Sequence, residues 1–574
     1  MRNEEVADLL DELADFHEIE EDQYRARAFR NAADSVESLS EDVAEVYERG
    51  DLREIEGVGD SIAEKIGEYL ETGELEYYQD LKDGHPSDVE ALTDVEGVGP
   101  KTADELHQAL GIETLEDLER AAREGEIASV EGFGEQTQHN ILEHVAEAKE
   151  GRERTLLGRA FSRAEEIRAR LDGDDAFGEV TVVGSFRRRR PTVGDVDVLA
   201  TASDREAAMD AFCSFEGVRE VLSRGETKSS VVVAGDLQVD LRVVDPASYG
   251  AALVYFTGSK EHNITLRDRA VHRDWKLNEY GLFDVSDVDG EDAGQRAGER
   301  LAGETEAAVY DALGCDWVPP ELREDTGEVA SATEGALPDL VERDDVRGDL
   351  QCHTDHSDGA ASVREMAAAA GERGLEYLLV TDHGPELDVV GGLDDEEFAT
   401  QREEVREVNE DGDVDVEVLH GVEAEVTEDG LGAPESWYGD VDLLVAAMHR
   451  APEEPTDRLC EALAAEPVDV LAHPTNRKLL ERSPVDLDLE RVVDVAAEQD
   501  VALEINAQPA RLDLDWRDVE RFRDDAAFVV STDAHDTDEF DFAHLGVAQA
   551  RRGWLEADDV LNTRPLEDLL AFFD

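Results

Sequence analysis

Residues 348–574 repeat one pattern, in which a short apolar segment is followed by a polar motif with histidine or an acidic residue. The apolar segments alternate with helical patterns, which predicts a parallel α/β domain. In a barrel of such units, the residues that follow the strands converge at one end. Imidazole and carboxylate groups together suit Zn, Mn or Fe. Six such motifs therefore predict a metal site, and they lie at residues 351–354 with 357–359, 380–383, 421–423, 447–449, 471–474 and 531–535.

Residues 1–150 have apolar positions at helical spacing, interrupted by short glycine turns. The segment Ile55–Ala63 recurs as Val95–Ala103, and a looser third copy spans Val130–Gly134. A Gly-x-Gly turn between helices points backbone N–H groups at a phosphate, and such contacts position DNA without reading its sequence. One such turn would be weak evidence. The repeat predicts helix–hairpin–helix modules whose DNA-binding residues are Gly57, Gly59, Gly97, Gly99 and Lys101.

The chain is acidic in every segment, with 144 Asp and Glu against 54 Lys and Arg and a formal charge of −90. Only eight of these cations are lysines. This balance is typical of a cytoplasmic protein of an extreme halophile, where a Debye length of about 3 Å at molar salt screens self-repulsion. The alternative is an acidic protein from an ordinary cell. Under the halophile interpretation, the net charge does not exclude nucleic acid as a partner.

Other features of composition bear on the compartment. The four cysteines are scattered without a CxxC motif, which argues against a disulfide framework and favours a reducing cytoplasm. No run of 18 apolar residues and no apolar leader is present, so we expect neither a membrane span nor a signal peptide.

Strand-like segments dominate residues 178–245, and three of the aspartates in this range lie in or directly beside apolar strands. Asp195 and Asp197 are two residues apart on one strand, so their side chains share a face. Asp240 is centred in a second apolar strand, where a carboxylate is costly to bury unless it is paired or metal-bound. Three such carboxylates could hold two Mg²⁺ about 3.5–4 Å apart for phosphoryl transfer. Gly184 and Ser185 form an upstream turn with donors for a triphosphate.

Residues 1–318 resemble the family X DNA polymerases, the family of DNA polymerase beta, in the order and spacing of several motifs. The matching stretches are 55–66, 184–199, 224–228, 239–243, 255–259 and 277–280. The resemblance implies that Asp195, Asp197 and Asp240 bind the catalytic metals. It further implies nucleotide- and DNA-contacting roles for Gly184, Ser185, Arg188, Arg242, Tyr255, Phe256, Gly258, Asn263 and Arg267.

Lys65 lies one helical turn after the first hairpin. A lysine amine can form a Schiff base with a sugar aldehyde, whereas composition alone favours an exposed helix cation. The resemblance implies that Lys65 is the catalytic lysine of a 5′-deoxyribose phosphate lyase. The chain departs from the family at Ser61, Phe29 and Lys260, and the first two substitutions bear on binding of the gap 5′-phosphate and on the lyase.

Residues 348–574 resemble the polymerase and histidinol phosphatase (PHP) domain, a distorted (β/α)₇ barrel with a site for up to three Mn²⁺ or Zn²⁺ ions. Gln351 stands where many PHP domains have the first histidine, and the block Glu504–Asp513 is similar to the version found in family X polymerases. His356, His420 and His544 lack a motif context and are expected to be structural. The implied metal ligands are His353, Asp358, His383, Glu423, His449, His473, Asp533 and His535.

The whole chain thus resembles the bacterial and archaeal family X polymerase, a multidomain α/β protein. We expect a lyase-like helical domain (1–82), a second helix–hairpin–helix domain (83–152), a nucleotidyltransferase palm (153–246), a nucleotide-selecting subdomain (247–318), a linker rich in Glu, Asp, Ala, Gly and Ser (319–347) and the PHP domain (348–574).

The expected function is repair synthesis in short gaps, with gapped or nicked DNA and dNTPs as partners, two Mg²⁺ at the polymerase site and a PHP 3′-5′ exonuclease or phosphoesterase. A monomer is compatible with the sequence. The alternatives are a PHP small-molecule phosphatase with a relic nucleotidyltransferase, and a non-catalytic DNA-binding scaffold.

Overall fold

The computed structural model divides the chain into two compact units, residues 1–154 and 155–574, and each is described by itself. No helix in the described parts of the chain is long and apolar enough to cross a bilayer. The described residues are 3–19, 23–37, 43–50, 52–55, 57–72, 75, 77–78, 92–93, 95, 98–130, 132–134, 137–142, 144–145, 154–233, 237–288, 294–387, 391–428 and 430–573.

The first unit is helical, as predicted, and has two separate apolar cores. Gly57 has φ +72° in the turn that leads into α4, a backbone conformation that glycine adopts without strain. Gly99 caps α7 and Pro100 occupies its first turn. The helices are α1 (Asn3–Ile19), α2 (Gln23–Glu37), α3 (Val43–Arg49), α4 (Asp60–Thr72), α7 (Pro100–Leu110) and α8 (Leu115–Glu124). Gly97 lies outside the described residues.

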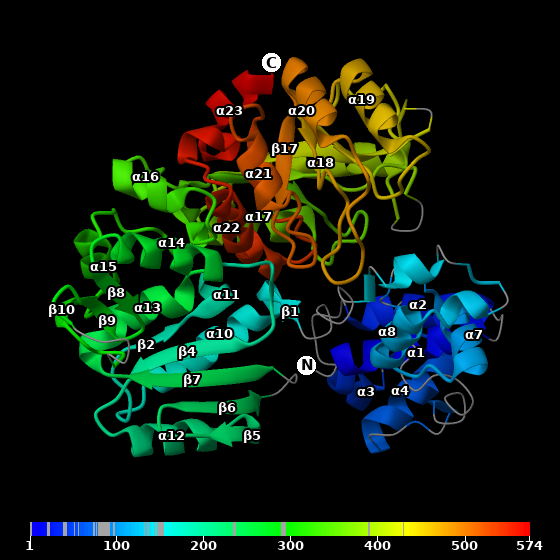
Figure 1. The fold of residues 1–574 in the computed structure, drawn as a ribbon. Helices are drawn as coiled ribbons and strands as arrows, with labels where there is room; N and C mark the ends of the chain where they lie inside the picture. The colour runs from blue at the N-terminus through cyan, green and yellow to red at the C-terminus, as the bar shows by residue number, and fades with distance from the viewer. Residues whose placement is uncertain are drawn as a thin grey trace. The chain divides into compact units, whose positions relative to one another are not determined.

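The second unit begins with a five-stranded sheet in the order β2-β4-β7-β6-β5, here called the palm sheet (Figure 1). Strands β4 and β7 are parallel, and their register pairs Asp197 with Asp240. Apolar side chains of α10 and α12 pack with those of the strands in one core. The elements are α10 (Leu157–Asp172), β2 (Val180–Val182), α11 (Gly184–Arg187), β4 (Val196–Thr201), α12 (Arg205–Ser214), β5 (Val218–Arg224), β6 (Lys228–Val233) and β7 (Gln238–Val244), with the short strands β1 (Thr155–Leu156) and β3 (Thr192–Val193) paired beside them.

A smaller helical subdomain with a three-stranded antiparallel sheet, β10-β9-β8, follows the palm. Its core includes Val254 and Leu266 of the first two helices and the fully buried Tyr310. The elements are α13 (Tyr249–Thr257), α14 (Lys260–Val271), β8 (Trp275–Asn278), β9 (Gly281–Asp284), β10 (Glu299–Ala302) and α15 (Glu306–Ala312).

Residues 319–347, expected to be a linker, are instead folded and packed. They form η5 (Pro320–Leu322), α16 (Glu328–Glu334) and η6 (Arg343–Asp345). Arg323 is fully buried and its Nη1 lies 2.6 Å from Glu306 Oε1. Glu328 is also fully buried and pairs with His262 of α14. The acidic composition that suggested a solvated connector therefore supplies buried ion pairs.

The C-terminal half is a parallel barrel with the strand order β11-β12-β13-β15-β16-β17-β18 (Figure 1). A parallel bridge between Cys352 and Ala534 joins the first strand to the last, which confirms the barrel prediction. The barrel strands are β11 (Gly348–Cys352), β12 (Tyr377–Val380), β13 (Glu417–Thr427), β15 (Leu443–Ala447), β16 (Val470–Leu471), β17 (Ala502–Asn506) and β18 (Phe528–Ser531), and the short β14 (Gly430–Leu431) pairs antiparallel with β13. The helices are α17 (Val363–Glu372), α18 (Asp395–Asp411), α19 (Pro455–Ala465), α20 (Leu489–Glu498), α21 (Trp516–Phe522), α22 (Ala543–Arg552) and α23 (Leu566–Phe573).

Candidate active sites

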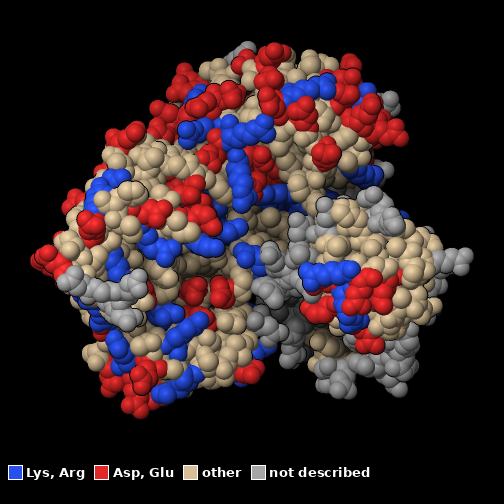
Figure 2. Space-filling view, in the orientation of Figure 1, with Lys and Arg blue, Asp and Glu red and all other residues tan. Residues whose placement is uncertain are grey.

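The palm sheet brings three carboxylates together. Asp195 precedes β4, Asp197 lies on β4 and Asp240 on β7, and each offers an oxygen within 4.8 Å of the other two. On the face drawn in Figure 2, a small group of acidic side chains lies in a hollow over the palm sheet, with basic side chains around it. A cluster of oxygen ligands of this kind suits hard divalent cations such as Mg²⁺.

The three carboxylates differ in their electrostatic surroundings. Burial, together with repulsion from Asp195 and Asp240, raises the pKa of Asp197 to about 6. Burial also acts to raise the pKa of Asp240, but the ammonium group of Lys228 and hydrogen bonds, including one from Gln238, hold it below its ordinary value. Divalent ions would counter the repulsion that raises the pKa of Asp197.

The turn before α11 is built around Gly184, which has φ +68°. A Cβ atom at this position would lie 2.8 Å from Asp197 Oδ2, so only glycine fits beside that carboxylate. Ser185 follows at the start of α11 and is partly exposed. The Gly-Ser turn expected to receive a triphosphate therefore lies directly against the carboxylate cluster.

The predicted triphosphate arginine, Arg188, is almost fully buried. Its Nε atom lies 3.0 Å from Glu324 Oε1 and its Nη1 donates to the Thr257 carbonyl at 2.7 Å. The neighbouring Arg187 forms a two-pronged pair with Glu306, at 2.9 and 2.8 Å. Both arginines are thus held in fixed orientations by acidic residues from later in the chain.

The other predicted nucleotide and DNA contacts lie on α13, α14 and the adjoining turn, apart from Arg242 on β7. Tyr255 and Phe256 pack edge to face with ring centroids 5.1 Å apart, and the Arg242 guanidinium lies 4.7 Å from the Phe256 centroid. Asn263 Nδ2 donates to the carbonyls of Tyr255 and Gly258 at 2.8 and 3.1 Å. Tyr255 and Arg267 also line a surface cavity of about 560 Å³.

In the first unit, Lys65 projects from α4 toward aromatic residues. Its Nζ donates to Ser61 Oγ at 3.0 Å and lies 4.3 Å from the Tyr77 ring centroid. Burial, and then repulsion by Arg25, lowers the pKa of Lys65. A lowered pKa raises the fraction of neutral amine, the form that attacks an aldehyde. Lys101 lies exposed in the first turn of α7.

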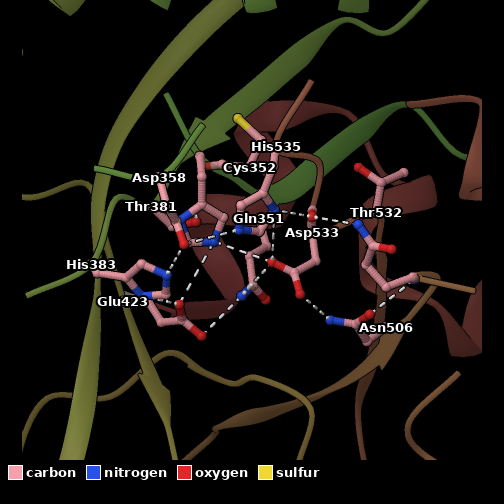
Figure 3. A network of polar contacts seen from close by, with 12 residues as sticks. Gln351, Cys352, Asp358, Thr381, His383, Glu423, Asn506, Thr532, Asp533 and His535 are labelled. Carbon is pink, nitrogen blue, oxygen red and sulfur yellow. Dashed lines mark hydrogen bonds and ion pairs between the residues drawn. The ribbon is translucent and has the colours of Figure 1, made fainter. Parts of the chain in front are cut away.

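The barrel gathers all eight predicted ligands at the C-terminal ends of its strands. Figure 3 shows side chains from both the first and the last strand segments directed toward one centre. His383 Nδ1 and His473 Nε2 lie 2.9 and 3.0 Å from the two oxygens of Glu423. The other separations, from 3.1 to 3.8 Å, join His353 to Asp533, Asp358 and Glu423, Asp358 to His383 and His535, and His449 to Glu423.

Several polar atoms of this cluster are buried without a hydrogen-bond partner among the described residues. They include both ring nitrogens of His353, Nδ1 of His473 and Oε1 of Gln351. Buried imidazole and carbonyl groups are costly to leave unpaired, so donor atoms of this kind indicate metal ligands. The set of residues fits Zn²⁺ or Mn²⁺.

Carboxylates and imidazoles in the cluster shift one another's pKa values. Burial acts to raise the pKa of Glu423, but the imidazoles of His449 and His383 hold it well below its ordinary value. Burial acts to lower the pKa of His535, but Asp358 and Asp533 raise it to about 10. Asp533 and His473 also have left-handed backbones, with φ +55° and +26°. Such strain is concentrated at functional sites.

Gln351 occupies the first ligand position at the end of β11. Its Nε2 donates to Glu423 Oε1 at 3.0 Å and lies 3.4 Å from Asp533 Oδ1. The amide therefore bridges two carboxylates in the way that a cation would. A glutamine here leaves one fewer imidazole for the ions.

Sequence reasoning missed residues that support the ligands. Glu425 Oε2 lies 2.8 Å from His449 Nδ1, and Glu504 Oε2 accepts from the His473 backbone at 2.7 Å. Arg511 Nε lies 3.7 Å from Asp533 Oδ2. Glu425 lies two residues after Glu423 on β13, and residues at this spacing share one face of a strand, so the spacing alone could have placed Glu425 beside the ligands. The histidines without a motif, His356, His420 and His544, have other side-chain or backbone partners and are outside the cluster.

These features define a class of protein: a nucleotidyltransferase joined to a metal-dependent phosphoesterase barrel. The matching family models are a helix-hairpin-helix domain (residues 1–75), a SAM-like helix-hairpin-helix tandem (89–147), the DNA polymerase beta thumb (252–324) and the PHP domain (349–508).

Relatives match both halves of the chain. The Bacillus subtilis (strain 168) protein named DNA polymerase/3′-5′ exonuclease PolX is 31% identical over 581 residues, covering 100% of this chain and 99% of that relative. DNA polymerase lambda of Rattus norvegicus is 26% identical over 340 residues, 56% of each chain. A probable phosphatase of Shewanella loihica is 32% identical over 167 residues, 28% of this chain and 62% of that relative. The chain belongs to the family X DNA polymerases that carry a C-terminal PHP domain.

Proposed function

We propose that this protein fills short gaps in DNA by template-directed synthesis, and that its barrel removes 3′ nucleotides or 3′ blocking groups. The observation that carries the polymerase assignment is the convergence of Asp195, Asp197 and Asp240 beside the Gly184 turn. The full-length match to a polymerase and 3′-5′ exonuclease supports the pairing of the two activities.

At the palm, the three carboxylates would hold two Mg²⁺, which neutralise charge on the attacking and leaving oxygens. Ser185 and Arg188 would bind the triphosphate, and the Tyr255–Phe256 pair would lie against the sugar of the incoming nucleotide. Asn263 and Arg267 would contact the minor groove. Because Gly184 adjoins Asp197, a triphosphate bound at this turn would lie beside the carboxylates.

In the barrel, the eight ligands would hold Mn²⁺ or Zn²⁺, which activate water for phosphodiester cleavage. Arg511, beside Asp533, would neutralise part of the charge of the scissile phosphate. A small-molecule phosphatase remains the second candidate for this half, favoured by the match to a probable phosphatase.

One assay separates these possibilities. A primed, gapped DNA is incubated with dNTPs and Mg²⁺, and separately with Mn²⁺ alone, in molar KCl. We expect primer extension in the first reaction and shortening from the 3′ end in the second. A protein that only hydrolyses phosphate from small molecules would overturn both assignments, and one that only binds the DNA would be a scaffold.

We also propose a 5′-deoxyribose phosphate lyase centred on Lys65. The half-buried amine beside Tyr77, with its lowered pKa, supports this role. Borohydride should trap a covalent adduct between the protein and a DNA end that carries 5′-deoxyribose phosphate. An undiminished adduct in Lys65→Ala would assign the chemistry to another amine.

The acidic composition supports a cytoplasmic protein of a halophile. Removing KCl should unfold and inactivate the protein, because repulsion among its carboxylates is then unscreened. Full activity and a native circular dichroism spectrum in dilute buffer would refute this proposal.

A further inference from the structure

Arg552 belongs to the barrel domain, at the end of α22, but its side chain reaches the palm at Arg188, just after α11. The side chain is almost fully buried, and its guanidinium lies 4.6 Å from the Trp516 ring centroid. Its Nη1 donates to the backbone carbonyl of Arg188 at 2.6 Å. A residue of the barrel thus holds the backbone of Arg188, the arginine predicted to bind the triphosphate.

Glu324 connects the two arginines. Its Oε1 accepts from Arg188 Nε at 3.0 Å and from Arg552 Nη2 at 3.2 Å. Burial acts to raise the pKa of Glu324, but Arg188 and Arg552 hold it below its ordinary value, so the carboxylate stays charged. One carboxylate therefore pairs with two guanidinium groups, and the three side chains together carry a net positive charge just after α11.

These contacts fix the orientation of the Arg188 side chain. Glu324 holds Nε, and the Thr257 carbonyl holds Nη1 at 2.7 Å. Nη2 takes part in neither contact. Because a guanidinium group is planar, fixing two of its nitrogens also fixes the direction of the third.

We propose that Arg552 and Glu324 are positioning residues for the incoming nucleotide, so that the barrel domain supplies part of the polymerase's nucleotide site. Arg552 holds the Arg188 backbone, and Glu324 holds its side chain. This inference rests on the proposed polymerase function, in which Arg188 binds the triphosphate. It goes beyond that function, because it makes a PHP-domain residue a determinant of dNTP affinity.

The experiment measures KM and kcat for a dNTP on gapped DNA with wild type, Arg552→Ala, Arg552→Lys and Glu324→Gln. Arg551→Ala is the matched control. Arg551 is the neighbouring residue of α22 and contacts the same 319–347 segment, through Glu321 Oε1 at 3.0 Å and the Val341 carbonyl at 3.0 Å. The Mn²⁺-dependent nuclease activity of each variant reports whether the barrel is folded.

We expect Arg552→Ala and Glu324→Gln to raise the KM for the dNTP about tenfold, the loss expected for a charge-assisted hydrogen bond, with kcat within about twofold. Arg552→Lys should give an intermediate KM, because a single ammonium group cannot donate to the Arg188 carbonyl and the Glu324 carboxylate in the geometry of the two guanidinium nitrogens. Arg551→Ala should keep the wild-type KM, and nuclease activity should be unchanged throughout.

An unchanged KM in nuclease-active Arg552→Ala and Glu324→Gln would overturn the proposal. An equal rise in Arg551→Ala would overturn it too, since the effect would then be a general loosening of the α22 contact. If Arg552→Ala loses nuclease activity by misfolding, the KM values of Arg552→Lys and Glu324→Gln decide the matter. A wild-type protein that does not extend the primer would instead refute the polymerase function itself.

Discussion

The carboxylate triad of the palm and the ligand cluster of the barrel differ in burial and in how protein groups balance their charge. Asp195 and Asp197 are partly exposed, and Lys228 pairs with Asp240. In the barrel, His353 and Glu423 are fully buried, and neither ring nitrogen of His353 has a hydrogen-bond partner among the described residues.

The difference in burial and charge balance predicts different roles for metal ions at the two sites. We expect a small, partly exposed triad with its own lysine to take up ions together with each nucleotide, so that these ions would serve turnover more than stability. Buried imidazoles with unmade hydrogen bonds carry a desolvation cost that bound ions would offset. The barrel's ions should therefore contribute to folding as well as to catalysis.

The largest expected effect is at the palm. Asp197→Ala should reduce primer extension at least about 1000-fold, because it removes an anionic ligand from two-metal chemistry. Nuclease activity and thermal stability should stay at the wild-type level. Asp210→Ala is the control, since Asp210 is an exposed palm carboxylate that pairs with Arg224. Wild-type extension by Asp197→Ala in a gel assay would refute the two-metal assignment.

The reciprocal change is the double substitution Asp533→Ala, His535→Ala. Nuclease activity with Mn²⁺ should fall by about 1000-fold, while extension on gapped DNA stays within about twofold. Asp538→Ala is the control, since this nearby carboxylate is exposed and outside the cluster. Nuclease activity that persists in the double variant would belong to another site and would leave the barrel with a structural role.

Metal removal should reveal the stability difference directly. Exhaustive chelation should lower the melting temperature of the second unit by about 10 °C, the loss of roughly 4 kcal/mol of binding energy from a domain of this size. Differential scanning calorimetry of wild type and Asp197→Ala should give the same shift, because the palm ions contribute little. An equal melting temperature with and without chelator would contradict the proposed contrast.

The smallest effect is expected from Gln351→His. An imidazole in place of the amide that now bridges Glu423 and Asp533 should bind one metal ion more tightly. Elemental analysis after dialysis should show a higher metal content per chain, by up to about one ion. Unchanged metal content would mean that Gln351 does not limit occupancy.

Much of the barrel site could be predicted, because most of the ligands follow short apolar strands and the strands share one direction, although Glu423 itself lies within β13. His353 and Asp533 needed only that rule to be placed together. Glu425 was missed because its partner, His449, lies 24 residues further along the chain, on the neighbouring strand segment. Local periodicity carries no information about which of two nearby carboxylates faces a given histidine.

The segment 319–347 shows the opposite outcome. Its composition predicts a solvated linker, yet Glu324 pairs with Arg188 and Arg552, which lie 136 and 228 residues away. The sequence around an acidic residue does not show whether its side chain faces water or a buried guanidinium. Only the fold distinguishes the two, because the pairing partners come from different domains.

The closure of the barrel has a consequence for the synthesis of the protein. Gln351 and Asp533 meet at the nuclease site, yet they are 182 residues apart in the chain. At a translation rate of roughly 5–20 residues per second, the ribosome needs about 10–40 s to make the intervening segment. The palm is finished earlier, so a nascent chain carries its complete carboxylate triad while its hydrolytic centre still lacks Asp533 and His535. The residues proposed for synthesis are therefore complete before those proposed for cleavage.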